Sequence, residues 1–144
     1  MTEACQVDFY VMQDESLSTE LLACRLALMA WQQGHRIMVV TENEEAMDRL
    51  DDLMWEYPQD RFLPHAQKSH GAAPVLIGQL EQLQDGDAEV VINLTRSTVP
   101  APQRFQRLLE LVPASEDQRQ ASRDKFREYR RLGLKPESHT MNRN

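Results

Sequence analysis

Short apolar runs that favour β-strands alternate with segments of helical periodicity along this chain, and this alternation is what most constrains its fold. Residues 17–33 place apolar side chains at three- and four-residue steps and end before Gly34, which is typical of a helix and its stop signal. Four runs predict strands: residues 7–12, 36–41, 75–77 and 90–94. Strands separated by helices predict an α/β domain with a mainly parallel sheet flanked by helices.

Capping signals and helix breakers indicate three more helices. Asn43 is a suitable cap for a helix that starts at Glu44 and ends before Pro58. Residues 100–111 are interpreted as another helix. Ser115 has capping-box spacing to the glutamine three residues later, so it is expected to open the final helix.

The length of 144 residues suits one domain with a real core and is too short for two. We expect a single domain over residues 1–135, followed by a polar and mobile tail over residues 136–144. No run approaches the ~20 apolar residues that cross a bilayer, and the N-terminus lacks the layout of a signal peptide. We therefore expect a cytoplasmic protein without membrane contact, in which Cys5 and Cys24 are reduced thiols.

Motifs for nucleotide binding and catalysis are missing. The five glycines are scattered and form no GxGxxG or GxxxxGK[ST] loop, so we expect a Rossmann-like fold without a nucleotide-binding loop. None of the four histidines lies in HxxxH or HExxH spacing, and no GxSxG elbow marks a nucleophile. We expect no catalytic residue, no metal site and no cofactor.

Residues 119–135 carry a local excess of positive charge. The segment holds seven basic residues against two acidic ones, a balance of +5 in a chain of net charge -7, so the rest of the chain totals -12. Phe126 lies close to a row of arginines that would line one helical face: Arg119, Arg123, Arg127 and Arg131. Arginines repel one another at this spacing, which favours an acidic ligand, with a merely solvated helix face as the alternative.

A second informative stretch, residues 53–65, holds large aromatic side chains and two prolines in a predicted loop after a helix. Trp55 and Phe62 are either core residues or anchors of a protein interface, because aromatic side chains serve both purposes. The sequence alone leaves both interpretations open.

An ordered set of motifs resembles one protein family over essentially the whole chain. The motifs are Leu53-x-Trp55, Phe62-x-Pro64-His65, Gly71-Ala72-Ala73-Pro74-Val75, Val112-Pro113 and Arg123-x-x-Phe126-Arg127-x-Tyr129-Arg130-x-x-Gly133. Each motif is weak alone, but in this order they resemble the chi subunit of bacterial DNA polymerase III, an accessory protein of the clamp loader. The resemblance implies a single α/β domain without catalytic activity that binds two partners. These are the psi subunit of the clamp loader and the C-terminal tail of single-stranded DNA-binding protein (SSB).

The resemblance also implies where the SSB tail binds. The corresponding positions here are Val112, Arg119, Arg123, Phe126 and Arg127, on the basic face already identified from charge. The family often has Tyr and Lys at the positions of Phe126 and Arg127, so a hydroxyl is lost here while the ring and the charge persist.

The psi-facing surface implied by the resemblance includes Phe62, with Trp55, Pro64 and His65 as neighbours that either contact psi or pack. A helicase-like protein is a further candidate partner for this surface. The alternative function is a direct single-stranded nucleic-acid-binding module that uses the same arginines on phosphates. A pI near 5.1 argues against that alternative, and we expect no direct DNA binding.

Overall fold

The structure, a computed structural model, describes residues 5–57 and 62–142. The strands within this part of the chain are β1 (Gln6–Met12), β2 (Ile37–Val40), β3 (His65–Gln67), β4 (Val75–Gly78), β5 (Val90–Asn93), β6 (Arg107–Val112) and β7 (Glu137–Met141). The helices are α1 (Thr19–Gln32), α2 (Glu44–Glu56) and α3 (Glu116–Arg131), with short 3-10 turns η1 (Lys68–His70), η2 (Leu80–Gln82) and η3 (Pro102–Arg104).

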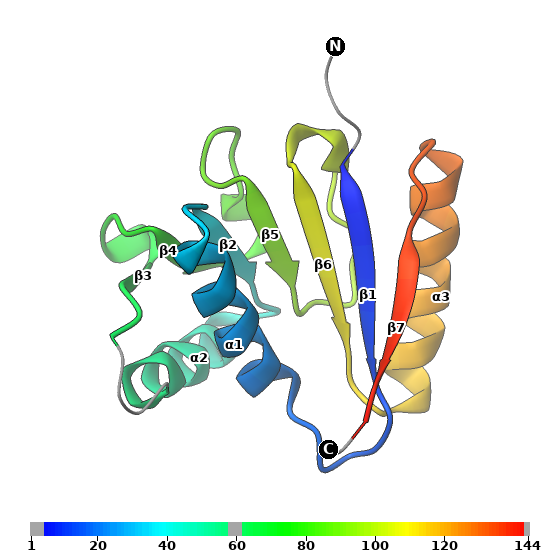
Figure 1. Ribbon diagram of the computed structural model, residues 1–144, viewed down its shortest axis with the longest axis horizontal. Helices are drawn as coiled ribbons and strands as arrows, with labels where there is room; N and C mark the ends of the chain where they lie inside the picture. The colour runs from blue at the N-terminus through cyan, green and yellow to red at the C-terminus, as the bar shows by residue number, and fades with distance from the viewer. Residues whose placement is uncertain (1–4, 58–61, 143–144) are drawn as a thin grey trace.

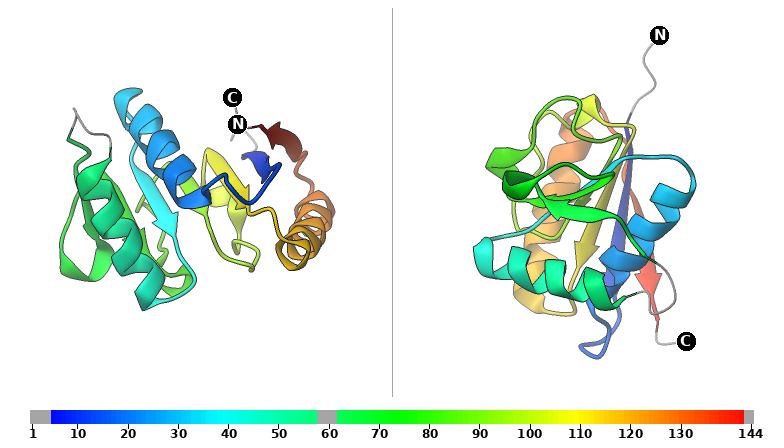
Figure 2. Two further views of the ribbon diagram at one scale, coloured as in Figure 1. Left: turned by 90° about the horizontal axis from the view of Figure 1, so that it is seen from below. Right: turned by 90° about the vertical axis from the view of Figure 1, so that its left-hand side faces the viewer.

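These strands form one parallel sheet with the order β3-β4-β2-β5-β6-β1-β7. Helices α1 and α2 cover one face and α3 covers the other, which gives three layers (Figure 1, Figure 2). The predicted α/β class with a parallel sheet flanked by helices is confirmed. Among the described residues, no helix is both long and apolar enough to span a membrane.

Each face of the sheet has its own apolar core. In β2, Ile37 and Val39 pack with α1 and α2, whereas Met38 and Val40 point into the core on the α3 side. Strands β2, β4 and β5 are buried along their whole length. A parallel strand covered on both faces favours apolar residues on both of its sides, which explains the near-continuous apolar runs in the sequence.

All three helices begin with a side-chain cap. Ser18, Asn43 and Ser115 each accept a hydrogen bond from the backbone N–H three residues later. The predicted caps at Asn43 and Ser115 are therefore confirmed. A cap of this kind typically contributes about 1 kcal/mol, because it satisfies an N–H that the helix itself leaves free.

The predicted helix over residues 100–111 is wrong. The turn η3 forms near its start, and β6 then runs between β5 and β1. Glu110 interrupts the apolar residues of this stretch, so their spacing resembles that of an amphipathic helix. In the structure Glu110 is fully buried, and hydrogen bonding to strands on both sides overrides the local pattern.

The prediction of a mobile tail over residues 136–144 is corrected for residues 136–142, whereas residues 143–144 lie outside the described residues. Glu137–Met141 form β7, which pairs in parallel with β1 at the edge of the sheet. The segment is polar, as predicted, but it belongs to the sheet rather than to a free tail. Polar residues suit this position because an edge strand keeps much of its surface in water.

A buried carboxylate helps to hold β7 in place. Asp8 of β1 accepts hydrogen bonds from His139 Nε2 of β7 at 2.9 Å and from Arg107 Nη2 of β6 at 3.0 Å. Burial raises the pKa of Asp8, but the hydrogen bonds from His139 and Arg107 outweigh it and leave the pKa below its ordinary value. The two donors therefore stabilise the charged form of a nearly inaccessible carboxyl group.

Candidate functional site

A pocket of about 370 Å³ lies between α3 and the end of the sheet formed by β6, β1 and β7. It collects all five residues that the sequence predicted for the tail-binding site: Val112, Arg119, Arg123, Phe126 and Arg127. Four further residues complete the lining: Phe9, Val11, Ser122 and Ser138.

The floor of the pocket is apolar. Phe9 of β1 and Phe126 of α3 place their ring centroids 5.3 Å apart at a tilt of 48°. Val112, at the carboxyl end of β6, is buried, and Val11 packs beside it from β1. An apolar side chain of a ligand would find two rings and two branched aliphatic groups here.

Three guanidinium groups surround this floor, because Arg119, Arg123 and Arg127 follow one another at single-turn spacing on α3. Arg119 reaches inward, and its Nη2 donates to the carbonyl oxygen of Met12 at 3.3 Å. Its Nε is buried and has no hydrogen-bond partner within the described part of the chain. A buried donor without a partner favours a ligand that brings an acceptor.

Arg123 and Arg127 are bound loosely to acids of their own helix. Arg123 Nη1 lies 3.4 Å from a Glu116 carboxylate oxygen, and Arg127 Nη1 lies 3.0 Å from one of Asp124. Both arginine side chains are more than half exposed, at 51% and 71%. Exposed pairs of this kind are typically worth about 0–1 kcal/mol, so a carboxylate ligand competes with them at little cost.

Not every basic residue of the 119–135 segment belongs to this face. Arg131 pairs with Glu128 and lies outside the pocket lining. Lys125 is buried against the sheet. The charge of the segment therefore overstates the positive charge that a ligand would meet.

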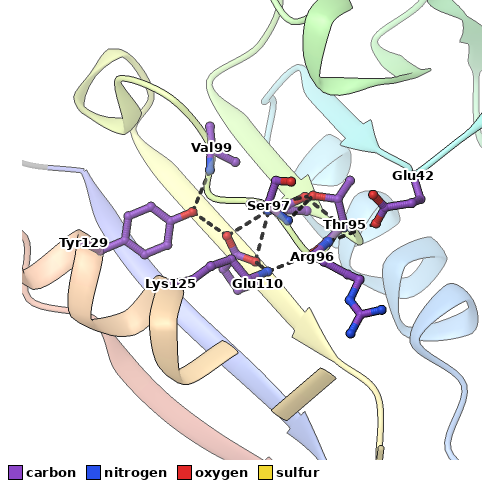
Figure 3. Close-up of polar contacts among 9 residues, drawn as sticks. Glu42, Thr95, Arg96, Ser97, Val99, Glu110, Lys125 and Tyr129 are labelled. Atoms are coloured by element: carbon purple, nitrogen blue, oxygen red, sulfur yellow. Dashed lines mark hydrogen bonds and ion pairs between the residues drawn. The ribbon is translucent and has the colours of Figure 1, made fainter. Parts of the chain in front are cut away.

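A buried polar network fixes α3 to the sheet (Figure 3). Glu110 of β6 accepts hydrogen bonds from Lys125 Nζ at 2.6 Å and from the Tyr129 hydroxyl at 2.5 Å. The Asn93 amide donates to both oxygens of the same carboxylate, at 3.2 and 3.0 Å. Burial and the Glu110 charge raise the pKa of Tyr129, which keeps its hydroxyl protonated as a donor.

The same network reaches the loop after β5. Lys125 Nζ also donates to the Thr95 carbonyl oxygen at 2.9 Å, and the Tyr129 hydroxyl accepts from the Val99 N–H at 3.0 Å (Figure 3). Because Lys125 and Tyr129 fix α3 against the sheet, they also fix the neighbouring part of the helix surface, where the three arginines line the pocket. The network thus sets the orientation of the site without touching a ligand.

The second predicted surface lies at the far edge of the sheet, near β3. Trp55 and Phe62 are each 62% exposed, and their ring centroids are 5.7 Å apart. His65 is buried beneath them, with its ring 4.8 Å from that of Trp55 and its Nδ1 2.7 Å from the Leu63 carbonyl oxygen. Trp55 and Phe62 are therefore surface residues, whereas His65 is a packing residue and Pro64 is half-buried.

One group of potential metal ligands occurs among the described residues, although the sequence spacing predicted none. Asp8, Glu137 and His139 place a carboxylate or imidazole atom within 4.8 Å of one another. Both Asp8 oxygens already accept hydrogen bonds, one of them from Arg107, whose positive charge opposes a cation. The donor set is therefore occupied by the protein itself and does not fit a resident metal ion.

Sequence reasoning missed four of the pocket residues. Phe9 and Val11 were assigned only to a strand, and their alternation was the available signal that both face the same side. Ser138 lies in the segment predicted to be a tail, and nothing in the sequence indicates that it lines a pocket. Ser122 lies one turn before Phe126 on α3, so helical spacing was the available signal for it.

Comparison with known proteins gives consistent results. Residues 4–137 match the protein family described as DNA polymerase III chi subunit, HolC. The chain is 36% identical to the DNA polymerase III subunit chi of Pseudomonas aeruginosa over 140 residues, which cover 96% of this chain and 98% of that protein. It is 26% identical to the subunit chi of Escherichia coli over 134 residues, covering 88% and 91% respectively.

Among solved structures, the crystal structure of T4 UvsW is similar to this chain with a TM-score of 0.62. The match covers 94% of this chain and 41% of that one at 8% sequence identity. At this level of identity the similarity concerns the fold alone.

Proposed function

Because this chain belongs to the DNA polymerase III chi subunit family, an accessory subunit of the replicative polymerase, we propose that it acts by binding two proteins and not by catalysis. The first partner is the acidic C-terminal tail of SSB, and the second is the psi subunit of the clamp loader. By holding both, the chain would link the polymerase to single-stranded DNA coated with SSB.

The observation that carries the first half of the proposal is the pocket beside α3. It joins an apolar floor to three guanidinium groups, one of which has a buried donor that finds no partner among residues 5–57 and 62–142. This combination suits a peptide that ends in an aromatic residue with a free carboxylate. The ring would contact the apolar floor, and the carboxylate would pair with a guanidinium group.

In the proposed complex, the terminal ring enters between Phe126 and Val112. The terminal carboxylate pairs with Arg123 or Arg127, and the remaining basic side chains meet the acidic residues upstream. A flexible peptide loses entropy when it is ordered on binding. We therefore expect a micromolar Kd, which corresponds to a binding free energy of about −8 kcal/mol. Several tails on one SSB tetramer would raise the overall affinity through effective concentration.

Calorimetry with three forms of the SSB tail peptide tests this half of the proposal. The natural peptide should bind, whereas a peptide without its last residue and one ending in an amide should both bind much more weakly. If all three bind equally, the pocket does not recognise a terminal ring and carboxylate. If bare single-stranded DNA binds instead, with a steep dependence on salt, the arginines serve phosphates and the alternative function is correct.

The exposed pair of Trp55 and Phe62 supports the second half of the proposal. Large rings at the surface are typical anchors of protein interfaces, where a few such residues provide most of the binding energy. We expect Phe62→Ala to reduce copurification with psi while SSB-tail binding and the melting temperature persist. A joint loss of both activities and of thermal stability would instead identify Phe62 as a structural residue.

A further inference from the structure

The helix that presents Trp55 is strongly acidic. Helix α2 holds six acidic residues and a single basic one, Arg49, whose Nε lies 3.7 Å from Glu20 of α1. The acidic residues are Glu44, Glu45, Asp48, Asp51, Asp52 and Glu56. Within the described part of the chain, Asp48, Asp52 and Glu56 form no ion pair.

Only some of these charges occupy positions that stabilise the helix itself. Glu44 and Glu45 lie in the first turn, where the helix dipole favours acids. Asp52 and Glu56 lie near the other end, where the dipole disfavours them, and no basic residue occupies the last turn. Helix stability therefore does not explain the acids around Trp55.

The acids and the rings share one surface. Asp48, Asp51 and Asp52 lie about one or two turns before Trp55 and so fall on its side of the helix. The Gln67 amide of β3 donates to Asp48 at 3.0 Å and to Asp51 at 3.4 Å, which places this row beside the edge strand. Asp51 also lies 3.0 Å from Nε2 of the buried His65. We call Asp48, Asp51, Asp52, Trp55 and Phe62 the acidic aromatic surface.

We propose that the acidic aromatic surface binds a basic protein segment whose arginine or lysine side chains pair with the aspartates and stack on Trp55. This inference rests on the proposed docking of psi and specifies the chemistry of the psi surface that makes contact. An exposed indole next to carboxylates suits a guanidinium, which stacks on the ring and donates hydrogen bonds to the acids at the same time.

The arrangement also separates the two partners. The acidic aromatic surface lies on α2 and the β3 edge, whereas the basic pocket lies beside α3 on the opposite face of the sheet (Figure 2). An acidic peptide is repelled from the first surface and attracted to the second. Opposite charges on opposite faces therefore direct each partner to its own site and allow both to bind together.

Binding of purified psi to four single variants tests the inference. Asp52→Lys should weaken binding at least about tenfold, Asp52→Asn by less, and the loss should shrink at high salt. Trp55→Ala should weaken binding about thirtyfold or more. The matched control Glu81→Lys makes the same charge change on η2, which packs on the α3 side, and should leave binding unchanged.

A folding defect does not mimic this result. A lysine at position 52 lies near the C-terminal end of α2, where the helix dipole favours it, so the melting temperature should stay or rise while affinity falls. If Asp52→Lys binds psi as tightly as the unaltered protein or more tightly, while Trp55→Ala loses affinity, psi docks on this surface but not through a basic segment. Absence of psi binding by the unaltered protein would overturn both.

Discussion

Lys125 and Arg123 lie on the same helix and carry the same charge, yet the structure predicts opposite consequences when each is replaced by methionine. Lys125 is 5% exposed and pairs with Glu110, which is 0% exposed. Lys125→Met leaves that carboxylate buried without its cation. Removing one partner of a buried ion pair typically lowers the free energy of unfolding by about 3–5 kcal/mol. This is a large part of the total, which is roughly 5–15 kcal/mol for a domain.

The loss in free energy of unfolding caused by Lys125→Met is measurable by urea unfolding followed by far-UV circular dichroism. For a chain of this size, 3–5 kcal/mol corresponds to a fall of about 10 °C or more in melting temperature. Arg123→Met is the matched control, because its side chain is exposed, and its free energy of unfolding should change by no more than about 0.5 kcal/mol.

A second substitution separates lost charge compensation from lost packing. Glu110→Gln, added to Lys125→Met, removes the unpaired charge and keeps an acceptor for the Tyr129 hydroxyl. The double variant should recover at least about 1 kcal/mol relative to Lys125→Met, even if Lys125→Met alone is mostly unfolded. A loss below about 1 kcal/mol in Lys125→Met, or no recovery in the double variant, would refute the account of the network.

Three further predictions concern other parts of the molecule. Arg123→Ala and Arg127→Ala should each weaken SSB-tail binding by at least about 1 kcal/mol in calorimetry without changing thermal stability, and undiminished binding in both would remove them from the site. Folding lowers the pKa of Asp8, so its contribution to stability is present above its ordinary pKa and is lost as the pH falls through the lowered pKa. When the free energy of unfolding is measured against pH, Asp8→Asn should therefore show a smaller decline on the acid side. Burial raises the pKa of Cys5 to about 11 and of Cys24 to about 12, so both thiols should react with a disulfide reagent only after unfolding, and rapid labelling of the native protein would contradict their burial.

The sequence predicted those elements whose signals are local. The caps at Asn43 and Ser115 and the apolar runs of β2 and β5 each depend on residues within one short segment. The arginine row of the pocket was predictable for the same reason, since helical spacing alone places these side chains on one face.

The failures occurred where distant residues decide the outcome. The charged Glu110 made the sequence of β6 resemble an amphipathic helix. Its burial in a strand depends on hydrogen bonds from Lys125 and Tyr129, which belong to a helix later in the chain. β7 has hardly any apolar residues, and it becomes a strand only by pairing with β1, about 130 residues away, with Asp8 and His139 131 positions apart. Lys125 was counted in the positive charge of residues 119–135, since nothing near it in the sequence reveals its acidic partner Glu110.

The pocket beside α3 is assembled from both ends of the chain, with Phe9 and Val11 from the first strand and Ser138 from the last. During synthesis, β1 leaves the ribosome long before β7 exists, so a nascent polypeptide lacks one wall of the pocket until β7 has been made. Only a chain that includes β7 has the complete pocket, so a fusion placed directly after β7 should disturb the pocket sooner than one placed on a distant loop.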